Sequence, residues 1–350
     1  DQSVRLIMSI PVFKPSIKRR DMHSVLSCLV TDVIGPAVLA DDLVATAAGE
    51  LGFEGGGAVR EYTRAIGLTI QALGLAKGDK AILSPLAPSA YHRAFQERGI
   101  LPVFADVKEA DGCLNPSDVE LKINADIRAL FVHAPLGRIP DMKAFNGFGI
   151  PIVGDIGEAL GARNIQGETL GSSCNFTLLP MEPNGIATAG GGTLILARDK
   201  KALSALTESA ESLTADAFLP DLNASLGLVQ WREYPHALEA RDIIAEVYRA
   251  ALHQGRHRTL SEPEGEGRGV PFSFPVVLSS GMNEVRKYAR KKGVETLPAF
   301  YTGVMEGFPE AGEQCPAAKS LMMSTLLFPL YPTLGKKNVQ LIVKVLSTLP

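Results

Sequence analysis

The stretch Lys80–Asp106 reads KAILSPLAPSAYHRAFQERGILPVFAD, and it decides the fold class. Its first five residues, Lys80–Ser84, form a short apolar run that predicts a buried strand. Ser89–Arg98 then predicts a helix, and Leu101–Asp106 predicts a second short strand. A strand, a helix and another strand in this order indicate a crossover connection between two parallel strands.

The same alternation continues on both sides of this unit. Ala58–Leu73 reads as a helical region whose first residues could be extended, and Gly74 and Gly78 end it. Pro116–Lys122 reads as a helix with Asn115 as its N-cap. Further short strands are predicted at Ala129–His133, Pro151–Asp155, Phe176–Leu179 and Thr193–Ala197. The pattern predicts an α/β fold with three α/β/α layers around a mainly parallel sheet.

Ligands of such sheets bind beyond the carboxyl ends of the strands. The residues that end the predicted strands are therefore candidate site residues. These are Ser84, His133, Asp155 and the segment that follows Leu179. For His133, a turn or core histidine without a ligand is at least as good an interpretation.

The last third of the chain predicts a smaller α+β domain. Leu222–Ala251 reads as one long helix or two in series, and Ser261–Gly269 as a surface loop. Strands are then predicted at Phe272–Leu278 and Leu326–Pro329, and helices at Met282–Lys292 and Lys336–Leu349. We expect an N-terminal segment over 1–34 that packs with the small domain, a large domain over 35–235 and a small C-terminal domain over 236–350.

Composition excludes several classes of protein. The 350 residues are 46% hydrophobic and 21% charged, as in ordinary globular proteins, and the formal net charge is −3. The basic run Lys18-Arg19-Arg20 is too short to indicate nucleic-acid binding. Four scattered cysteines favour reduced thiols over disulfides or a metal site. We find no signal-peptide pattern and no membrane-spanning run, and we expect a cytoplasmic protein with no membrane partner.

Six short segments, in the right order, carry a family resemblance. They are IPVFKPSI at Ile10–Ile17, DVIGPA at Asp32–Ala37, ALGLAKGDK at Ala72–Lys80, HAPLGRIPDM at His133–Met142, ASLGLVQ at Ala224–Gln230 and FPLYPTL at Phe328–Leu334. In these segments the chain resembles the DegT-type family of pyridoxal-phosphate (PLP) dependent sugar aminotransferases. The resemblance implies the fold type I of PLP-dependent transferases.

The resemblance also implies where a cofactor ring would lie. The family's strand-end motif D-A-A-Q-x-x-G corresponds to DIGEALG at Asp155–Gly161. The family aspartate pairs with the protonated pyridine nitrogen of the cofactor, and Asp155 keeps that position. Without the family context, Asp155 would read as a strand-end residue that caps the next helix. Glu158 replaces the family glutamine and adds a second carboxylate beside Asp155.

The largest departure from the family is at the catalytic lysine. The family motif F-S-F-Y-P-T-K-N-L-G, followed by G-G, corresponds to FTLLPMEPNG at Phe176–Gly185, followed by Gly190-Gly191. Glu182 stands at the lysine position, and no lysine lies between Lys143 and Lys200. Glutamate has no amine and cannot form the Schiff base that holds the cofactor. At best it would act as a general base toward pyridoxamine phosphate (PMP) bound without a covalent bond.

The phosphate-binding residues of the family are also altered. The family's glycine-threonine pair at a helix start corresponds to Tyr62-Thr63, and we expect Tyr62 to fill the phosphate pocket. Thr63 and Thr177 keep hydroxyls that suit a phosphate. The nearby run Gly55-Gly56-Gly57 reads as a turn rather than a phosphate loop.

Two further family contacts are missing. The aromatic residue that stacks on the cofactor ring corresponds to Pro88. Tyr91 could replace it, although ordinary helix packing is the better interpretation. The family's N-Y-R segment, which reaches the phosphate in the partner subunit, corresponds to Asp216-Ala217-Phe218, and an acidic residue there would repel a phosphate.

Two functions follow from these residues. The first is a degenerate homologue without covalent chemistry, in which the pocket binds a ligand in a regulatory role. The second is an active sugar-modifying enzyme that uses non-covalently bound PLP or PMP, and the retained Asp155 and Thr177 favour it. The resemblance implies PLP, PMP or no cofactor, and a nucleotide sugar or another small molecule as ligand. It also implies a homodimer, for which the apolar stretch Leu321–Leu330 offers surface to bury.

Overall fold

The computed structural model describes residues 9–350 except 32, 254, 262–266 and 280. Within this part of the chain, the strands form a seven-stranded sheet, a three-stranded sheet and a two-stranded pair. The strands are β1 (Gly55–Val59), β2 (Lys80–Leu83), β3 (Leu101–Phe104), β4 (Ile127–His133), β5 (Ile152–Asp155), β6 (Arg163–Asn164), β7 (Phe176–Pro180), β8 (Thr193–Ala197), β9 (Gly267–Arg268), β10 (Phe274–Val277), β11 (Leu297–Pro298) and β12 (Thr325–Phe328).

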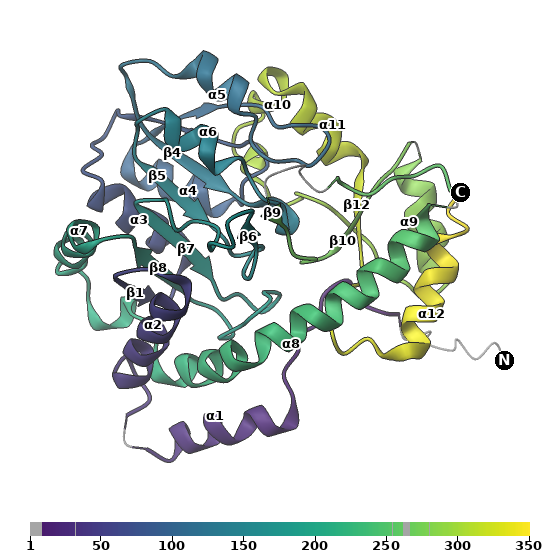
Figure 1. The fold of residues 1–350 in the computed structure, drawn as a ribbon, viewed down its shortest axis with the longest axis horizontal. Helices are drawn as coiled ribbons and strands as arrows, with labels where there is room; N and C mark the ends of the chain where they lie inside the picture. Colours follow the sequence, from purple (N-terminus) through teal and green to yellow (C-terminus); the bar gives the residue numbers. More distant parts are fainter. Residues whose placement is uncertain (1–8, 32, 254, 262–266, 280) are drawn as a thin grey trace.

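Helices surround both larger sheets (Figure 1). The α-helices are α1 (Met22–Leu29), α2 (Val38–Leu51), α3 (Tyr62–Ala72), α4 (Ala90–Arg98), α5 (Pro116–Lys122), α6 (Met142–Gly147), α7 (Lys200–Ala210), α8 (Asp221–Leu252), α9 (Met282–Lys291), α10 (Ala311–Gln314), α11 (Pro316–Ser324) and α12 (Gly335–Leu346). Short 3-10 helices are η1 (Arg19–Asp21), η2 (Pro135–Gly137), η3 (Ala215–Ala217) and η4 (Val304–Glu306). The predicted N-cap of α5 is confirmed, because the Asn115 side chain accepts a hydrogen bond from the amide of Ser117 at 3.1 Å.

The seven-stranded sheet has the order β1-β8-β7-β5-β4-β2-β3. The five strands from β7 to β3 are mutually parallel. At one edge, β8 runs antiparallel to β7, and β1 runs antiparallel to β8. The crossover predicted from Lys80–Asp106 is confirmed, since β2 and β3 pair in parallel with α4 between them in the chain. The predicted mainly parallel α/β sheet is therefore confirmed.

The two faces of this sheet belong to separate clusters of buried side chains. Alternate residues of a strand point to opposite faces, so Leu83 and Phe131 pack with α3 and α4 in one cluster. Their neighbours Ile82 and Leu130 pack in another cluster with Val119 of α5 and Phe145 of α6. Both faces are thus covered, which gives the three predicted layers.

The small sheet, in the order β10-β12-β11, has its own cluster of buried side chains with α9, α12 and the second half of α8. Helix α8 is one continuous helix despite Pro235 and runs from the large sheet to the small one (Figure 1). Helix α8 therefore spans the domain boundary that the sequence places at 235/236, and these domain bounds stay a prediction. In the N-terminal segment, Ile10 pairs with Val294 beside the small sheet, while α1 packs on α8.

Three details correct the sequence predictions. Gly55–Gly57 is part of strand β1 and not a turn: a Cβ on Gly56 would lie 2.1 Å from the carbonyl oxygen of Ile195, so only glycine permits this close pairing with β8. Leu321–Leu330 is mostly not free surface, because β12 is the central strand of the small sheet and its side chains are buried, whereas Met323 of the preceding helix is exposed. In the predicted loop Ser261–Gly269, Gly267 and Arg268 form β9, and 262–266 lie outside the described residues.

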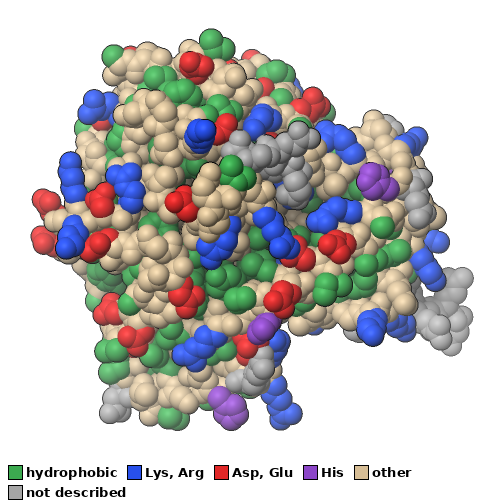
Figure 2. All heavy atoms as spheres, in the orientation of Figure 1, with side chains coloured by type: hydrophobic (Ala, Val, Ile, Leu, Met, Phe, Trp, Pro, Cys, Tyr) green, Lys and Arg blue, Asp and Glu red, His purple; other side chains and the backbone are tan. Residues whose placement is uncertain are grey.

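Large apolar side chains that are exposed gather instead on and around α1, at Ile17, Met22, Leu26, Leu29, Val30, Val33, Ile34 and Val38. We call these residues the α1 patch. Elsewhere, on the face shown in Figure 2, acidic and basic side chains are interspersed. All four cysteines are buried and carry free thiols, as predicted. No helix in the described ranges has the length and apolar character needed to cross a membrane.

One buried carboxylate joins the first turns of α2 and α8. Asp221, the first residue of α8, accepts hydrogen bonds from the amides of Ala37, Leu39 and Ala40 at 3.0, 3.1 and 3.0 Å. These amides belong to the first turn of α2, where backbone donors have no partner within the helix. A negative charge at this helix end is also favoured by the helix dipole.

We expect Asp221→Ala to lower the free energy of unfolding by about 2–3 kcal/mol, because it leaves buried amides without an acceptor. Urea unfolding followed by circular dichroism measures the change. Asp42→Ala, at an exposed residue of α2, is the control and should stay within about 0.5 kcal/mol of the parent protein. Equal effects of the two substitutions would contradict the capping role.

Candidate functional site

A cleft of about 300 Å³ lies at the carboxyl ends of the parallel strands. His133 ends β4, Asp155 ends β5, Leu86 and Pro88 follow β2, and Glu182 follows β7. Its other wall comes from distant parts of the chain. The residues of that wall are Phe13, Phe272, Phe300, Tyr301, Thr302, Gly303 and Leu327. The cleft therefore lies at the carboxyl ends of the strands, where the sequence predicted a ligand site.

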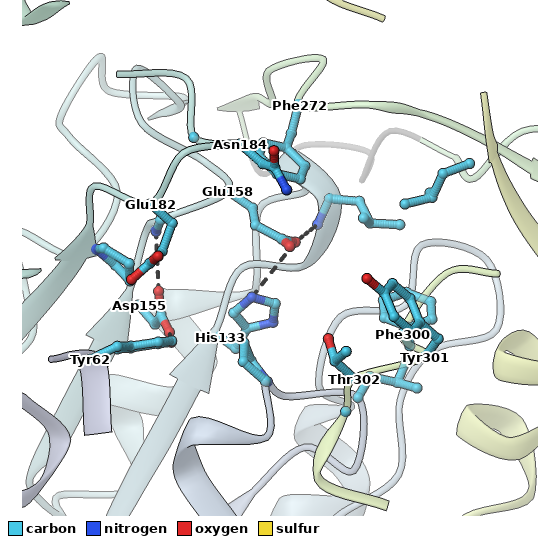
Figure 3. A pocket seen from close by; sticks show the side chains of 18 of the residues that line it. Tyr62, His133, Asp155, Glu158, Glu182, Asn184, Phe272, Phe300, Tyr301 and Thr302 are labelled. Atoms are coloured by element: carbon cyan, nitrogen blue, oxygen red, sulfur yellow. Dashed lines mark hydrogen bonds and ion pairs between the residues drawn. The ribbon is translucent and has the colours of Figure 1, made fainter. Parts of the chain in front are cut away.

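Asp155 is the most enclosed carboxylate of the cleft, with 2% of its surface exposed. Its Oδ2 accepts hydrogen bonds from the hydroxyls of Tyr62 and, at 2.9 Å, Tyr91. Its Oδ1 accepts one from the amide of Gly157 at 3.1 Å. A buried charge requires partners, and here all three are neutral donors. Figure 3 shows the Tyr62 side chain reaching Asp155 across the floor of the cleft.

Tyr62 and Tyr91 come from the first turns of α3 and α4, which cover the same face of the sheet. Their rings meet edge to face, with centroids 5.9 Å apart, and Tyr91 also packs against Phe95 and Phe131. Burial, together with the negative charge of Asp155, raises the pKa of both phenols well above the ordinary value of 10. Both hydroxyls therefore remain protonated donors at neutral pH.

Glu158 lies beside this group and projects into the cleft (Figure 3). Its Oε2 accepts a hydrogen bond from the amide of Leu136 at 2.6 Å and lies 3.7 Å from Nε2 of His133. Burial raises the pKa of the Glu158 carboxyl, although His133 and the Leu136 amide oppose the shift. The sequence left open that His133 is a turn or core histidine without a ligand. In the structure it lines the cleft next to the Glu158 carboxylate.

Glu182 follows the end of β7 and is a wall residue with an exposed side chain. It makes no hydrogen bond or ion pair with the described residues through its carboxylate. Partial burial nevertheless raises the pKa of this carboxyl above its ordinary value. The lining described here contains no lysine and no arginine.

The structure brings Tyr62, Pro88, Asp155, Glu158 and Glu182 together in one cleft. It does not bring the two predicted phosphate hydroxyls there. Thr177 is fully buried and its hydroxyl donates to the carbonyl of Gly171 at 2.9 Å, while Thr63 lies outside the lining. The hydroxyl of Tyr62 binds Asp155, and the expectation that Tyr62 fills the phosphate pocket stays a prediction. Asp216 is an exposed residue of η3 outside the lining.

Strained backbone occurs on both walls. Leu136 and Phe300, with φ of 51° and 62°, are the non-glycine residues of the described chain in the left-handed region, and both line the cleft. Such a conformation costs on the order of 1 kcal/mol or more and is concentrated at functional sites. The strained Leu136 directs its amide at Glu158, so the strain serves the geometry of the cleft.

Sequence reasoning missed several cleft residues. Tyr91 lies outside the lining but donates to Asp155. The sequence favoured helix packing for it over a place on the cofactor ring, whereas the need of a buried tyrosine hydroxyl for an acceptor was the available signal. Phe13, Phe272 and the segment Phe300–Gly303 reach the cleft only through the arrangement of the two sheets. No local pattern in the sequence marks them.

A mainly parallel α/β sheet with a cleft at its carboxyl edge, covered by a smaller α+β unit, is the fold of type I PLP-dependent aminotransferases. The putative sugar aminotransferase Spr1654 from Streptococcus pneumoniae, solved in its PLP form, superposes with a TM-score of 0.88 at 18% identity, and 97% of this chain and 98% of that one are covered. The chain belongs to the DegT/DnrJ/EryC1/StrS aminotransferase family, which it matches over residues 51–347. The predicted family and fold are confirmed.

Curated relatives cover most of the chain. It is 23% identical to GDP-perosamine synthase of Escherichia coli O157:H7, with 94% of this chain and 95% of that protein covered. It is 22% identical to a protein named pleiotropic regulatory protein in Geobacillus stearothermophilus, with 80% and 81% covered.

The phenols of Tyr91, which is buried, and Tyr62, which is half-buried, predict a loss of stability at alkaline pH. Their folded-state pKa values exceed those of the unfolded chain, so their contribution is fully present below about pH 10 and is lost as the pH rises above it. We expect the ionisation of each phenol to lower the free energy of unfolding by at most about 1.4 kcal/mol per pH unit. The free energy of unfolding in urea, measured between pH 8 and pH 11, gives the slope.

Tyr62→Phe and Tyr91→Phe should each make this slope shallower, although both also weaken the protein at neutral pH by removing a donor to Asp155. Tyr301→Phe removes an exposed phenol from the same cleft and should leave the slope unchanged. A slope equal in all four proteins would show that the phenols of Tyr62 and Tyr91 ionise without unfolding.

Proposed function

We propose that this chain is a DegT-type homologue that does not form a Schiff base with PLP and keeps its cleft as a binding site for a small molecule, in a ligand-binding or regulatory role. The observation that carries the proposal is the set of partners of Asp155. In the resemblance to the family, this carboxylate pairs with the pyridine nitrogen of the cofactor. Here both of its oxygens are already occupied by donors of the chain itself.

The residues of the cleft do not fit PLP or PMP. The hydroxyl of Tyr62 holds the position on Asp155 that the ring nitrogen would need, and its side chain crosses the cleft floor where a ring would approach. Glu182 supplies a carboxylate where the cofactor requires an amine. We therefore assign no step to either cofactor.

The phosphate of the cofactor would also lack a partner. A phosphate group needs cations or free backbone amides, and the described lining offers no lysine or arginine. It offers Glu158 and Glu182 instead. The negative charge of a phosphate would be repelled by these carboxylates.

The alternative is an active sugar-modifying enzyme that binds PLP or PMP without a covalent bond. The retained Asp155 and Thr177 favoured it. In the structure Asp155 is occupied by two phenols, and the Thr177 hydroxyl is used by the carbonyl of Gly171. The same contacts therefore support the first function. A relative named as a regulatory protein is in keeping with it.

Borohydride trapping tests the proposal directly. We expect the parent protein, mixed with PLP and reduced, to carry no pyridoxyl adduct on a residue of the cleft, as read by peptide mass spectrometry. Glu182→Lys restores the amine but leaves Tyr62 in place, and we expect at most a trace of adduct at position 182. In Tyr62→Ala/Glu182→Lys the ring has space, and we expect an adduct at position 182 at least tenfold more abundant.

The matched control is Tyr301→Ala/Glu182→Lys, which removes a different tyrosine of the cleft and keeps Tyr62. It should behave like Glu182→Lys alone. An adduct on any lysine that reaches the cleft of the parent protein would overturn the proposal. A full adduct in Glu182→Lys alone would show that Tyr62 does not block the ring.

We also propose that the chain forms a homodimer through the α1 patch. Val30, with 86% of its surface exposed, is the most exposed large apolar side chain of the patch. A cluster of exposed apolar side chains of this kind marks an interaction surface. The stretch Leu321–Leu330, from which the sequence predicted the interface, is mostly buried within the chain, and its one exposed large apolar side chain, Met323, is not part of the α1 patch.

Light scattering of the parent protein should give the mass of a dimer. Leu29→Asp/Val30→Asp places two charges in the patch and should shift the protein to the monomer at micromolar concentration, because unpaired buried charges oppose association. Leu121→Asp, at a residue of α5 with 84% of its surface exposed, is the control and should remain dimeric. A monomeric parent protein would contradict the interface.

A further inference from the structure

The charge of the cleft narrows the chemistry of its ligand. Three carboxylates line it, those of Asp155, Glu158 and Glu182, and the lining described here holds no lysine or arginine. His133 is the one basic side chain among these lining residues. The partners of Asp155 are two phenols and an amide, which donate hydrogen bonds but carry no positive charge.

The carboxylates also differ in the number of hydrogen-bond partners that the chain supplies to each. One oxygen of Glu158 is held by the Leu136 amide, and the carboxylate of Glu182 has no partner in the described chain. Burial raises the pKa of both carboxyl groups; His133 and the Leu136 amide oppose the shift at Glu158, and the only cause at Glu182 is burial. A ligand with a positive charge would supply what the chain does not.

The opposite wall is aromatic. Phe300 and Tyr301 face the side of the cleft that carries Glu158 and Glu182 (Figure 3). Phe13 and Phe272 lie together, with ring centroids 5.6 Å apart. Aromatic faces attract cations and cover the apolar face of a ring-shaped ligand. Their position across from the carboxylates therefore defines an orientation: charge toward Glu158 and Glu182, and ring toward Phe300 and Tyr301.

Size adds a further limit. A volume of about 300 Å³ is at the lower end of small-molecule sites. This volume suits a ligand with a single ring better than a nucleotide sugar. A diphosphate would in addition meet the same carboxylates that disfavour PLP.

From this geometry we infer that the cleft binds a compact protonated amine without a phosphate group, with its ammonium toward Glu158 and Glu182 and its body against Phe300 and Tyr301. The inference rests on the proposed function, since it assigns a ligand class to the same cleft. Glucosamine is a suitable probe because it can be compared with two sugars that have the same ring and a different charge. Glucose lacks the ammonium group, and glucosamine 6-phosphate adds a phosphate.

Isothermal titration calorimetry of the parent protein with these three sugars is the test. We expect glucosamine to bind at least tenfold more tightly than glucose and at least tenfold more tightly than glucosamine 6-phosphate. Its affinity should fall severalfold between 50 and 500 mM NaCl, because salt screens the attraction between the charges.

Variants locate the contact. Glu182→Gln and Glu158→Gln keep the shape of each side chain and should each weaken glucosamine at least fivefold, with little effect on glucose. Glu208→Gln neutralises an exposed carboxylate of α7, outside the cleft, and should leave both affinities unchanged. Circular dichroism of each variant confirms that it is folded.

Equal or tighter binding of glucose or glucosamine 6-phosphate would overturn the inference and leave a small-molecule site in place. Absence of glucosamine binding in the folded parent protein would overturn it as well. Neither result bears on the borohydride experiment, which alone decides whether the chain can hold PLP covalently. The two proposals therefore fail separately.

Discussion

The hydrogen bonds from Tyr62 and Tyr91 to Asp155 are the constraint on which the cleft depends. Asp155 ends the central strand β5 and is almost fully buried, and a carboxylate in that position cannot persist without donors. Two phenols meet the need because α3 and α4 begin above the same edge of the sheet. The arrangement fixes where both helices start and closes the floor of the cleft.

This constraint connects the fold with the chemistry. Parallel strands deliver their last residues to one edge, so His133, Asp155 and Glu182 are neighbours although they lie far apart in the sequence. The chemistry possible at this edge of the sheet then depends on which side chains lie beside Asp155. Neutral donors stabilise a carboxylate and hold no cofactor ring, whereas a lysine amine would provide both a charge and a nucleophile.

Much of the fold could be predicted because its signals are local. Short apolar runs, helix caps and terminal glycines marked the strands and helices of the large sheet, and strand ends marked Asp155 and His133. Contacts between distant segments carried no such signal. The direction of Tyr62, the acceptor of Tyr91 and the arrival of Phe300 at the cleft follow from tertiary packing. Leu321–Leu330 shows the same limit, since an apolar run has the same composition whether it meets a partner or its own core.

The departures from the family pattern are linked by electrostatics. The resemblance implies a lysine at the position of Glu182, and under the proposed function a carboxylate there removes the positive charge that a phosphate-bearing ring would meet. Under the same proposal no ring binds, and Asp155 needs another donor, which Tyr62 provides and a glycine at position 62 could not. The phenol then holds the position on Asp155 that the ring nitrogen would need. Each change thus favours the others, and this mutual dependence explains why a carboxylate can stand at position 182 without any cation of the described lining beside it.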